Sequence, residues 1–182
     1  MKIVYIRHGK KLYANNRNKE YYRWLRKHDS PLSKDGVIQV KHLGNELKRM
    51  IDEGNVEKPD LVLVSPYQRA IDTWTMMNDN LQLDVECKVD VYLSEYLGNQ
   101  KFTDRTLHTE KYNPPTHHET VEMLEDRCRL HVEDLELYKG RGVKNIWVIS
   151  HGFTISKILE CILRMKEDEF YLKEGEMMEV TI

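Results

Sequence analysis

Short runs of strand-forming residues alternate with longer stretches in which apolar side chains recur at helical spacing, and this alternation limits the possible folds more than any other feature. Strand-like runs occupy residues 2–6, 61–64 and 145–149. The run 61–64 reads Leu-Val-Leu-Val, which is typical of a strand buried on both faces of a parallel sheet. The alternation predicts an α/β fold, namely a three-layer α/β/α sandwich with a mostly parallel central sheet.

The remaining elements follow from the same patterns. Ser33 or Asp35 is placed to cap the first helix, and Gly54 is placed to end it. Three further helices are expected at 67–78, 118–138 and 153–164. Two shorter strands are expected near 85–91 and 177–182, and the second of them is predicted to be an edge strand.

Length and charge indicate one soluble domain. The 182 residues show no repeat or linker, so we expect a single domain over 1–182 with substrate-reading insertions at 10–29 and 96–118. The 28 basic and 30 acidic residues give a net charge of −2, and a surface built for nucleic acid is therefore not expected. Basic residues gather between positions 10 and 28, where they form either a lid or a solvated helix. An edge strand near the C-terminus is compatible with a monomer or a homodimer.

Cysteine usage and the N-terminus indicate the compartment. Cys87, Cys128 and Cys161 are widely spaced and form no C-x-x-C pair, so we expect small buried apolar side chains rather than disulfides. No stretch is long and apolar enough for a signal peptide or a membrane helix, so a cytoplasmic protein without a membrane partner is expected. His117-His118-Glu119 lacks metal-ligand spacing and is interpreted as a solvated helix start, and no metal is expected.

Two histidines follow predicted strands directly, in Arg7-His8-Gly9 and Ser150-His151-Gly152. Arg69 and Glu95 also fall just beyond predicted strand ends, and in a doubly wound sheet these ends share one crevice. Two guanidinium groups and two imidazoles meeting there would form a cationic cage that suits the oxygens of a phosphoryl group. Glu95 adds a group that gives and takes a proton, and a histidine can act as a nucleophile.

The ordered set of motifs resembles the histidine phosphatase superfamily, in particular its phosphoglycerate mutase-like branch. The motifs that carry the resemblance are Arg7-His8-Gly9, Ser65-Pro66-x-x-Arg69-Ala70, Glu95 and Ser150-His151-Gly152. The resemblance implies that His8 attacks phosphorus and forms a phosphohistidine that water then hydrolyses. It also implies that Arg7, Arg69 and His151 hold the phosphoryl oxygens, that Glu95 is the proton donor, and that no cofactor is needed.

Further substrate-binding residues are expected beside these groups. They are Gly9, Lys10, Asn15, Gly152 and Glu119, and Glu119 also competes with Glu95 for the role of the acid. Lys10 and Lys11 stand where mutases of the branch commonly carry Glu or Gln and then Ser, which favours hydrolysis over transfer. A mutase-type phosphotransferase and a non-catalytic phospho-ligand binder remain the alternatives. The substrate is a small phosphate ester or a phosphorylated macromolecule.

Overall fold

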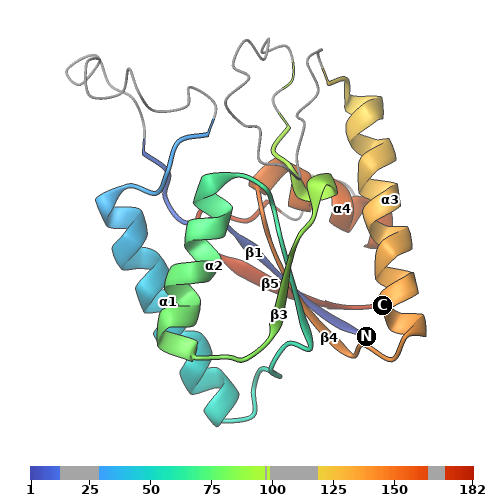
Figure 1. Cartoon of the computed structure of the whole chain (residues 1–182). Helices are drawn as coiled ribbons and strands as arrows, with labels where there is room; N and C mark the ends of the chain where they lie inside the picture. Colours follow the sequence, from blue (N-terminus) through green and yellow to red (C-terminus); the bar gives the residue numbers. More distant parts are fainter. Residues whose placement is uncertain (13–28, 97, 99–118, 164–170) are drawn as a thin grey trace, which may run out of the picture.

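The computed structural model describes residues 1–12, 29–96, 98, 119–163 and 171–182. Figure 1 shows a central sheet with helices packed against both of its faces. In chain order the elements are β1 (Lys2–Arg7), α1 (Lys34–Asp52), β2 (Leu61–Val64), α2 (Gln68–Leu81), β3 (Glu86–Val89), the 3₁₀ turn η3 (Val91–Leu93), α3 (Val121–Gly140), β4 (Asn145–Ser150), α4 (Gly152–Leu163) and β5 (Met177–Thr181).

The sheet places β1 and β4 side by side at its centre. Its strand order is β3-β2-β4-β1-β5, and every neighbouring pair is parallel except β1 with β5. Arg7 lies opposite Ser150 in the register of β1 and β4. Because His8 and His151 each follow one of these paired residues, two histidines separated by most of the chain leave the sheet at adjacent points.

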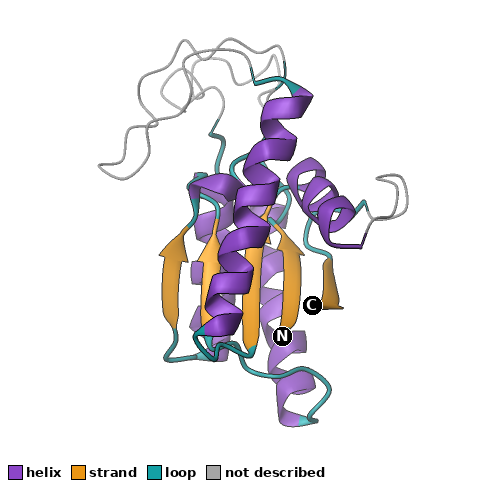
Figure 2. Cartoon of the chain, turned by 90° about the vertical axis from the view of Figure 1, so that its right-hand side faces the viewer, coloured by secondary structure: helices purple, strands orange, loops and turns teal. Residues whose placement is uncertain are grey.

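Alternate residues of each central strand face different helix layers. Ile3 and Tyr5 of β1 pack with α3 and α4, whereas Val4 and Ile6 pack with α1 and α2. Figure 2 shows α3 crossing one face of the sheet, with α1 and α2 behind it. The structure thereby confirms the predicted three-layer α/β/α sandwich with a mostly parallel sheet.

Local capping explains where the helices begin and end. The Ser33 hydroxyl accepts a hydrogen bond from the Gly36 amide at 3.0 Å and caps α1, so the first of the two expected caps is confirmed. α2 continues to Leu81, three residues beyond the predicted end, and Gln82 then ends it in the left-handed conformation at φ 51°. The C-terminal strand β5 lies at the sheet edge, as expected.

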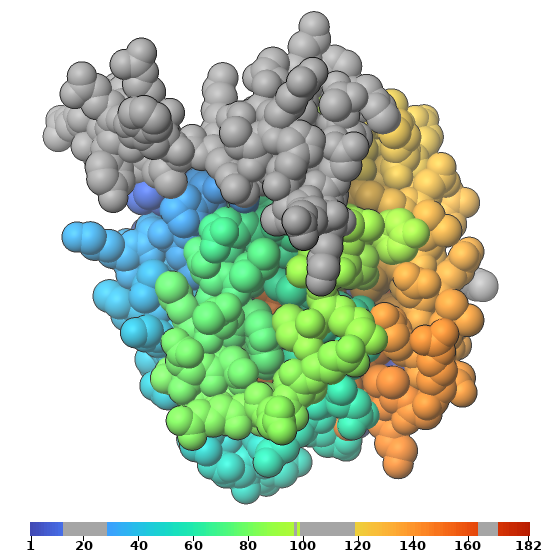
Figure 3. Space-filling model, in the orientation of Figure 1, coloured from blue at the N-terminus to red at the C-terminus, as the bar shows by residue number. Residues whose placement is uncertain are grey.

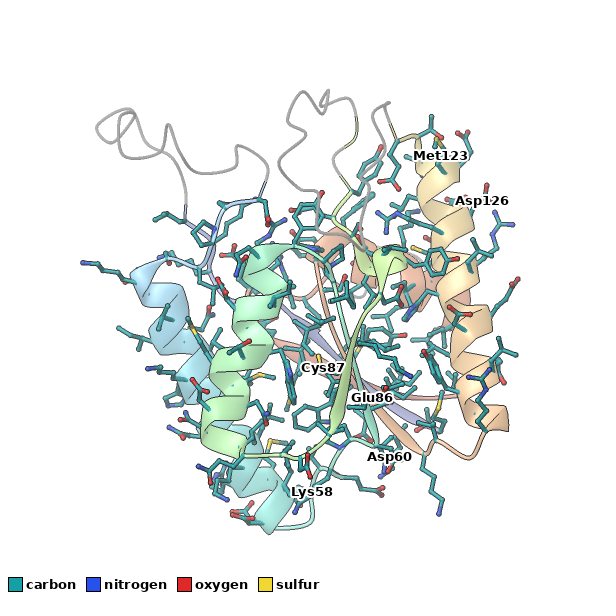
Figure 4. The ribbon with its side chains drawn as sticks, in the orientation of Figure 1. Lys58, Asp60, Glu86, Cys87, Met123 and Asp126 are labelled. Carbon is teal, nitrogen blue, oxygen red and sulfur yellow. The ribbon has the colours of Figure 1, made fainter. Side chains whose placement is uncertain are left out.

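The other edge strand corrects one expectation. β3 is only four residues long and is mostly exposed, with Cys87 at the surface. The prediction that all three cysteines are buried is therefore wrong for Cys87; it holds for Cys128, and Cys161 is half-buried. Figure 4 labels Cys87 and Glu86 on this strand, and Figure 3 shows β3 exposed on the same face as α1, α2 and α3.

Both insertions expected from the sequence fall mostly outside the described residues, because 13–28, 97 and 99–118 are not described. In the described part of the chain, no helix combines the length and the apolar character needed to cross a membrane. The two chain ends lie side by side, since the N-terminal ammonium donates to the Ile182 carbonyl at 2.7 Å.

Candidate active site

His8 and His151 lie together at the carboxyl ends of β1 and β4. Their ring centroids are 5.1 Å apart in an edge-to-face arrangement, and both side chains are buried. Neighbouring parallel strands bring them together, because each histidine is the first residue after its strand. The expectation that the two strand-end histidines come together is met by this geometry.

The hydrogen bonds of His8 leave its ring nitrogen Nε2 unprotonated. Nδ1 lies 2.7 Å from the Gly9 carbonyl oxygen, which can only accept, so Nδ1 carries the proton. Nε2 accepts a hydrogen bond from Arg69 Nε at 3.3 Å. Burial, and then the Arg69 charge, lower the pKa of His8 to about 3, against the weaker opposing effect of the Gly9 carbonyl. At neutral pH, Nε2 of His8 therefore carries a lone pair instead of a proton, and this lone pair accepts the hydrogen bond from Arg69.

This low pKa predicts a pH-dependent stability. Between pH 7 and pH 5 the unfolded chain takes up a proton on His8 while the folded chain does not, so acidification favours unfolding. The His8 contribution over this interval is about 1–2 kcal/mol. Urea unfolding at the two pH values should therefore show that the free energy of unfolding falls less between pH 7 and pH 5 for His8→Asn than for the wild-type protein. Equal losses would contradict the low pKa.

Arg69 is the centre of the site. Its side chain is buried at 1 % exposure, and it is the second residue of α2, the helix that follows β2. Besides His8, the guanidinium contacts the Glu95 carboxylate and lies 3.3 Å from His151 Nδ1. It also lies 3.8 Å from the buried Asp29 carboxylate. The fork of one arginine thus links both histidines and two carboxylates.

The second histidine is held on both sides of its ring. His151 Nε2 lies 2.8 Å from the Ser65 hydroxyl, and Nδ1 faces Arg69 Nη2. Because a guanidinium only donates, Nδ1 accepts, and the ring proton is on Nε2, where Ser65 accepts it. Burial, followed by the Arg69 and His8 charges, holds the pKa of His151 well below its usual value. Ser65 was quoted in a sequence motif, but no role was predicted for it.

The structure shows which of the two candidate acids, Glu95 or Glu119, lies beside the histidines. Glu95 contacts Arg69, and its Oε2 lies 3.7 Å from His151 Nδ1. Glu119 instead holds the Arg127 side chain through both carboxylate oxygens, at 2.5 and 3.2 Å. Glu95 is therefore the carboxylate placed among the histidines, and Glu119 is occupied by an arginine of α3.

Arg7 also faces this end of the sheet. A Cβ on Gly152 would lie 2.8 Å from Arg7 Nη1, so the guanidinium passes directly over the residue that follows His151. Arg7 donates to the Leu172 carbonyl at 2.8 Å and lies 5.0 Å from the centroid of the exposed Tyr171 ring. Gly152 leaves the space that Arg7 occupies.

The other predicted binding residues have varied surroundings. A Cβ on Gly9 would lie 2.4 Å from Val40 Cγ2, and the Gly9 amide donates to the Thr73 hydroxyl, a contact that sequence reasoning missed. The Lys10 ammonium pairs with Asp35 at 2.9 Å. Asn15 lies outside the described residues. Gly9 thus makes room for α1, and the prediction that its bare backbone approaches a ligand remains a prediction.

Asp29 is a further residue that sequence analysis did not predict. It is buried, it accepts a hydrogen bond from the Gln68 amide at 2.7 Å, and it lies beside Arg69. The carboxylate therefore interacts with both the first turn of α2 and the arginine on that turn. Among the residues placed by the structure, no group of three or more His, Cys, Asp or Glu side chains could hold a metal ion.

Comparison with known proteins defines the class. The chain matches the family model of the histidine phosphatase superfamily, branch 1, over residues 3–182, and it therefore belongs to that superfamily. The resemblance stated from its motifs is confirmed, and so is the prediction that it is an enzyme of the phosphatase kind.

Individual relatives are more distant. The chain is 26 % identical over 159 residues to the phosphohistidine phosphatase SixA homolog of Haemophilus influenzae, with 87 % of this chain and 75 % of the relative covered. The solved structure of SixA with tungstate aligns at a TM-score of 0.68 and 18 % identity, covering 100 % of this chain and 88 % of SixA. The solved structure of the α-ribazole phosphatase of Shigella flexneri aligns at a TM-score of 0.70 and 19 % identity, covering 100 % of this chain and 91 % of that protein.

Proposed function

We propose that the protein hydrolyses phosphate monoesters through a phosphohistidine on His8. The observation that carries this proposal is the unprotonated Nε2 of His8, which faces the buried Arg69 guanidinium at 3.3 Å. A lone pair beside a fixed cation is suited to attack a phosphorus whose oxygens that cation binds. The related SixA structure is a complex with tungstate, an oxyanion that resembles phosphate, and this supports a phosphoryl-binding function.

The first step transfers the phosphoryl group to the enzyme. Nε2 of His8 forms a bond to phosphorus as the bond between phosphorus and the ester oxygen breaks. The protonated Glu95 carboxyl gives its proton to the departing oxygen, which leaves as an alcohol. Glu95 is assigned this role because its carboxyl group lies beside the two histidines, with Oε2 3.7 Å from His151 Nδ1.

The second step releases phosphate. The Glu95 carboxylate takes a proton from water, the water oxygen bonds to phosphorus, and the bond between phosphorus and Nε2 breaks. Inorganic phosphate leaves, and both His8 and Glu95 return to their starting forms. Arg7 and Arg69 neutralise the equatorial oxygens in each step, and His151 lies beside them.

A panel of phosphate esters tests this function against its alternatives. We expect wild-type protein to release inorganic phosphate from an aryl phosphate and from several alkyl phosphates without a bisphosphate primer, with kcat/KM of about 10⁴ M⁻¹s⁻¹ or more for the best substrate. Activity that requires a primer and moves phosphate between hydroxyls would indicate a mutase. Saturable binding of phosphate esters without turnover would indicate a binder.

The same panel addresses the substrate. It includes a protein phosphorylated on histidine, because the Haemophilus influenzae relative is named a phosphohistidine phosphatase homolog. The panel also includes sugar and nucleoside monophosphates, since the segments expected to read the substrate have no pattern that names one. The ester with the highest kcat/KM identifies the substrate class.

A further inference from the structure

The segment that carries Glu95 is short, and its internal hydrogen bonds all lie within a single turn. It runs from Asp90 to Glu95 and is called here the acid-bearing segment; it includes η3, a single 3₁₀ turn of three residues. Asp90 Oδ1 accepts a hydrogen bond from the Tyr92 amide at 2.8 Å and caps this turn. One turn alone does not fix a catalytic carboxyl, so the placement of Glu95 depends on what surrounds the segment.

Three consecutive carbonyl oxygens before Glu95 each accept a side-chain hydrogen bond. The Tyr92 carbonyl accepts from Arg127 Nη1 at 2.5 Å, the Leu93 carbonyl from the Ser150 hydroxyl at 2.8 Å, and the Ser94 carbonyl from the Thr154 hydroxyl at 2.8 Å. The three donors belong to α3, β4 and α4. The backbone that leads to Glu95 is therefore held from three elements at successive residues.

A fourth contact comes from α3. His131 is fully buried, and its Nδ1 donates to Asp90 Oδ2 at 2.7 Å, while the other oxygen of Asp90 caps η3. His131 follows Arg127 by one helical turn, so the two side chains lie on the same face of α3. In Figure 1 the turn after β3 lies beside α3 and α4, which supply Arg127, His131 and Thr154.

The same donors are coupled to the rest of the site. Ser150 precedes His151 directly, and Thr154 lies in the first turn of α4, so both hold the acid-bearing segment to the junction that carries the second histidine. The Glu119 carboxylate accepts hydrogen bonds from Nε and Nη2 of the same Arg127 guanidinium. Hydrogen bonds to charged groups in buried surroundings are short and strongly directional, so they can hold the backbone before Glu95 at a fixed distance from the histidines.

We propose that Arg127, His131, Ser150 and Thr154 form a clamp that positions the Glu95 carboxyl for proton transfer to the leaving oxygen. None of the four is proposed to touch the substrate; they are positioning residues that act through the backbone of the acid-bearing segment. The proposal rests on the function given above, in which Glu95 is the proton donor. A displacement of about 1 Å in a catalytic group lowers the rate substantially, so loosening the clamp weakens the acid before it affects the nucleophile.

Leaving-group dependence distinguishes this role from general structural support. The nitrophenolate of p-nitrophenyl phosphate departs readily without a proton, whereas the alkoxide of glycerol phosphate needs one. A misplaced acid should therefore slow the alkyl ester selectively. The quantity to measure is kcat/KM for both esters, because it reports the step in which the leaving group departs.

Two pairs of variants isolate the hydrogen bonds. Thr154→Val removes a hydroxyl with little change of shape, and Thr154→Ser keeps it. His131→Leu removes the donor to Asp90, and His131→Asn offers an amide N–H near the position of Nδ1. We expect Thr154→Val and His131→Leu to lower kcat/KM for glycerol phosphate about 10- to 100-fold and for p-nitrophenyl phosphate less than about threefold. Thr154→Ser and His131→Asn should restore most of the alkyl activity.

Leu135→Val is the control for a loosened helix. Leu135 is buried one turn beyond His131 on α3, so this change disturbs the same face without removing a polar contact. It should affect both esters equally. The proposal is overturned if Thr154→Val and His131→Leu slow both esters by the same factor, or if Leu135→Val gives the same selective loss.

Glu95→Gln identifies which claim has failed. If Glu95→Gln slows the alkyl ester selectively and the clamp variants do not, only the clamp is wrong. If Glu95→Gln shows no dependence on the leaving group, the acid assignment of the proposed function is wrong, and the clamp proposal fails with it.

Discussion

His8→Asn should lower kcat for every phosphate ester about 10⁴-fold or more, because it removes the atom that forms the bond to phosphorus. The asparagine amide can still donate to the Gly9 carbonyl, as His8 Nδ1 does at 2.7 Å, but it has no atom at the position of Nε2. The fold should therefore survive the change. Steady-state phosphate release and a thermal unfolding scan measure the two effects.

A second histidine provides the control. His42 is exposed on α1, where its Nδ1 lies 3.8 Å from the Glu46 carboxylate. His42→Asn makes the same chemical change far from the cage and should leave kcat within about twofold of wild type. If His8→Asn retains a tenth or more of wild-type activity, the nucleophile lies elsewhere.

Arg69→Met should produce the second large effect, on both activity and stability. Methionine matches much of the length of arginine but cannot neutralise phosphoryl oxygens, and we expect kcat/KM to fall about 10³-fold or more. The change also leaves the buried Asp29 carboxylate without its neighbouring cation. Loss of one partner of a buried ion pair costs about 3–5 kcal/mol, which urea unfolding would measure.

Arg69→Lys separates charge from geometry. Lysine keeps the positive charge but lacks the fork that contacts His8, His151 and Glu95 at once, so it should recover part of the stability and little of the activity. Arg49→Met is the matched control, since Arg49 is exposed and its side chain, within the part of the chain that the structure describes, forms an ion pair only with Glu53. That change should cost about 0.5 kcal/mol or less and leave activity unaltered. Wild-type activity in Arg69→Met would contradict the role of the cage.

The sequence predicted the central strands well because their signal is local. β1, β2 and β4 are buried on both faces, so their apolar runs are continuous. β3 has one solvent-exposed edge and only four residues, Glu86 and Lys88 among them, and its bounds were predicted too widely. The strand order β3-β2-β4-β1-β5 depends on pairing between distant segments, and no local pattern encodes it.

The site divides in the same way. His8, Arg69, Glu95 and His151 could be proposed as a group because each follows a strand. Asp29 and the Asp90–His131 pair could not, because their partners are 39 to 41 residues away in sequence. One signal was present for His131: it lies three residues after Cys128 and four before Leu135, in the buried stripe of α3. A titratable residue in such a stripe indicates a buried partner.

The most direct test of the central claim is to isolate the covalent intermediate. Wild-type protein mixed briefly with p-nitrophenyl phosphate and quenched in alkali should gain one phosphoryl group, stable to base and labile to acid as a phosphoramidate is, and peptide mass spectrometry should locate it on His8. A phosphoryl group on another residue, or turnover under rapid quench with no phosphorylated protein at any time, would contradict the mechanism proposed for this site.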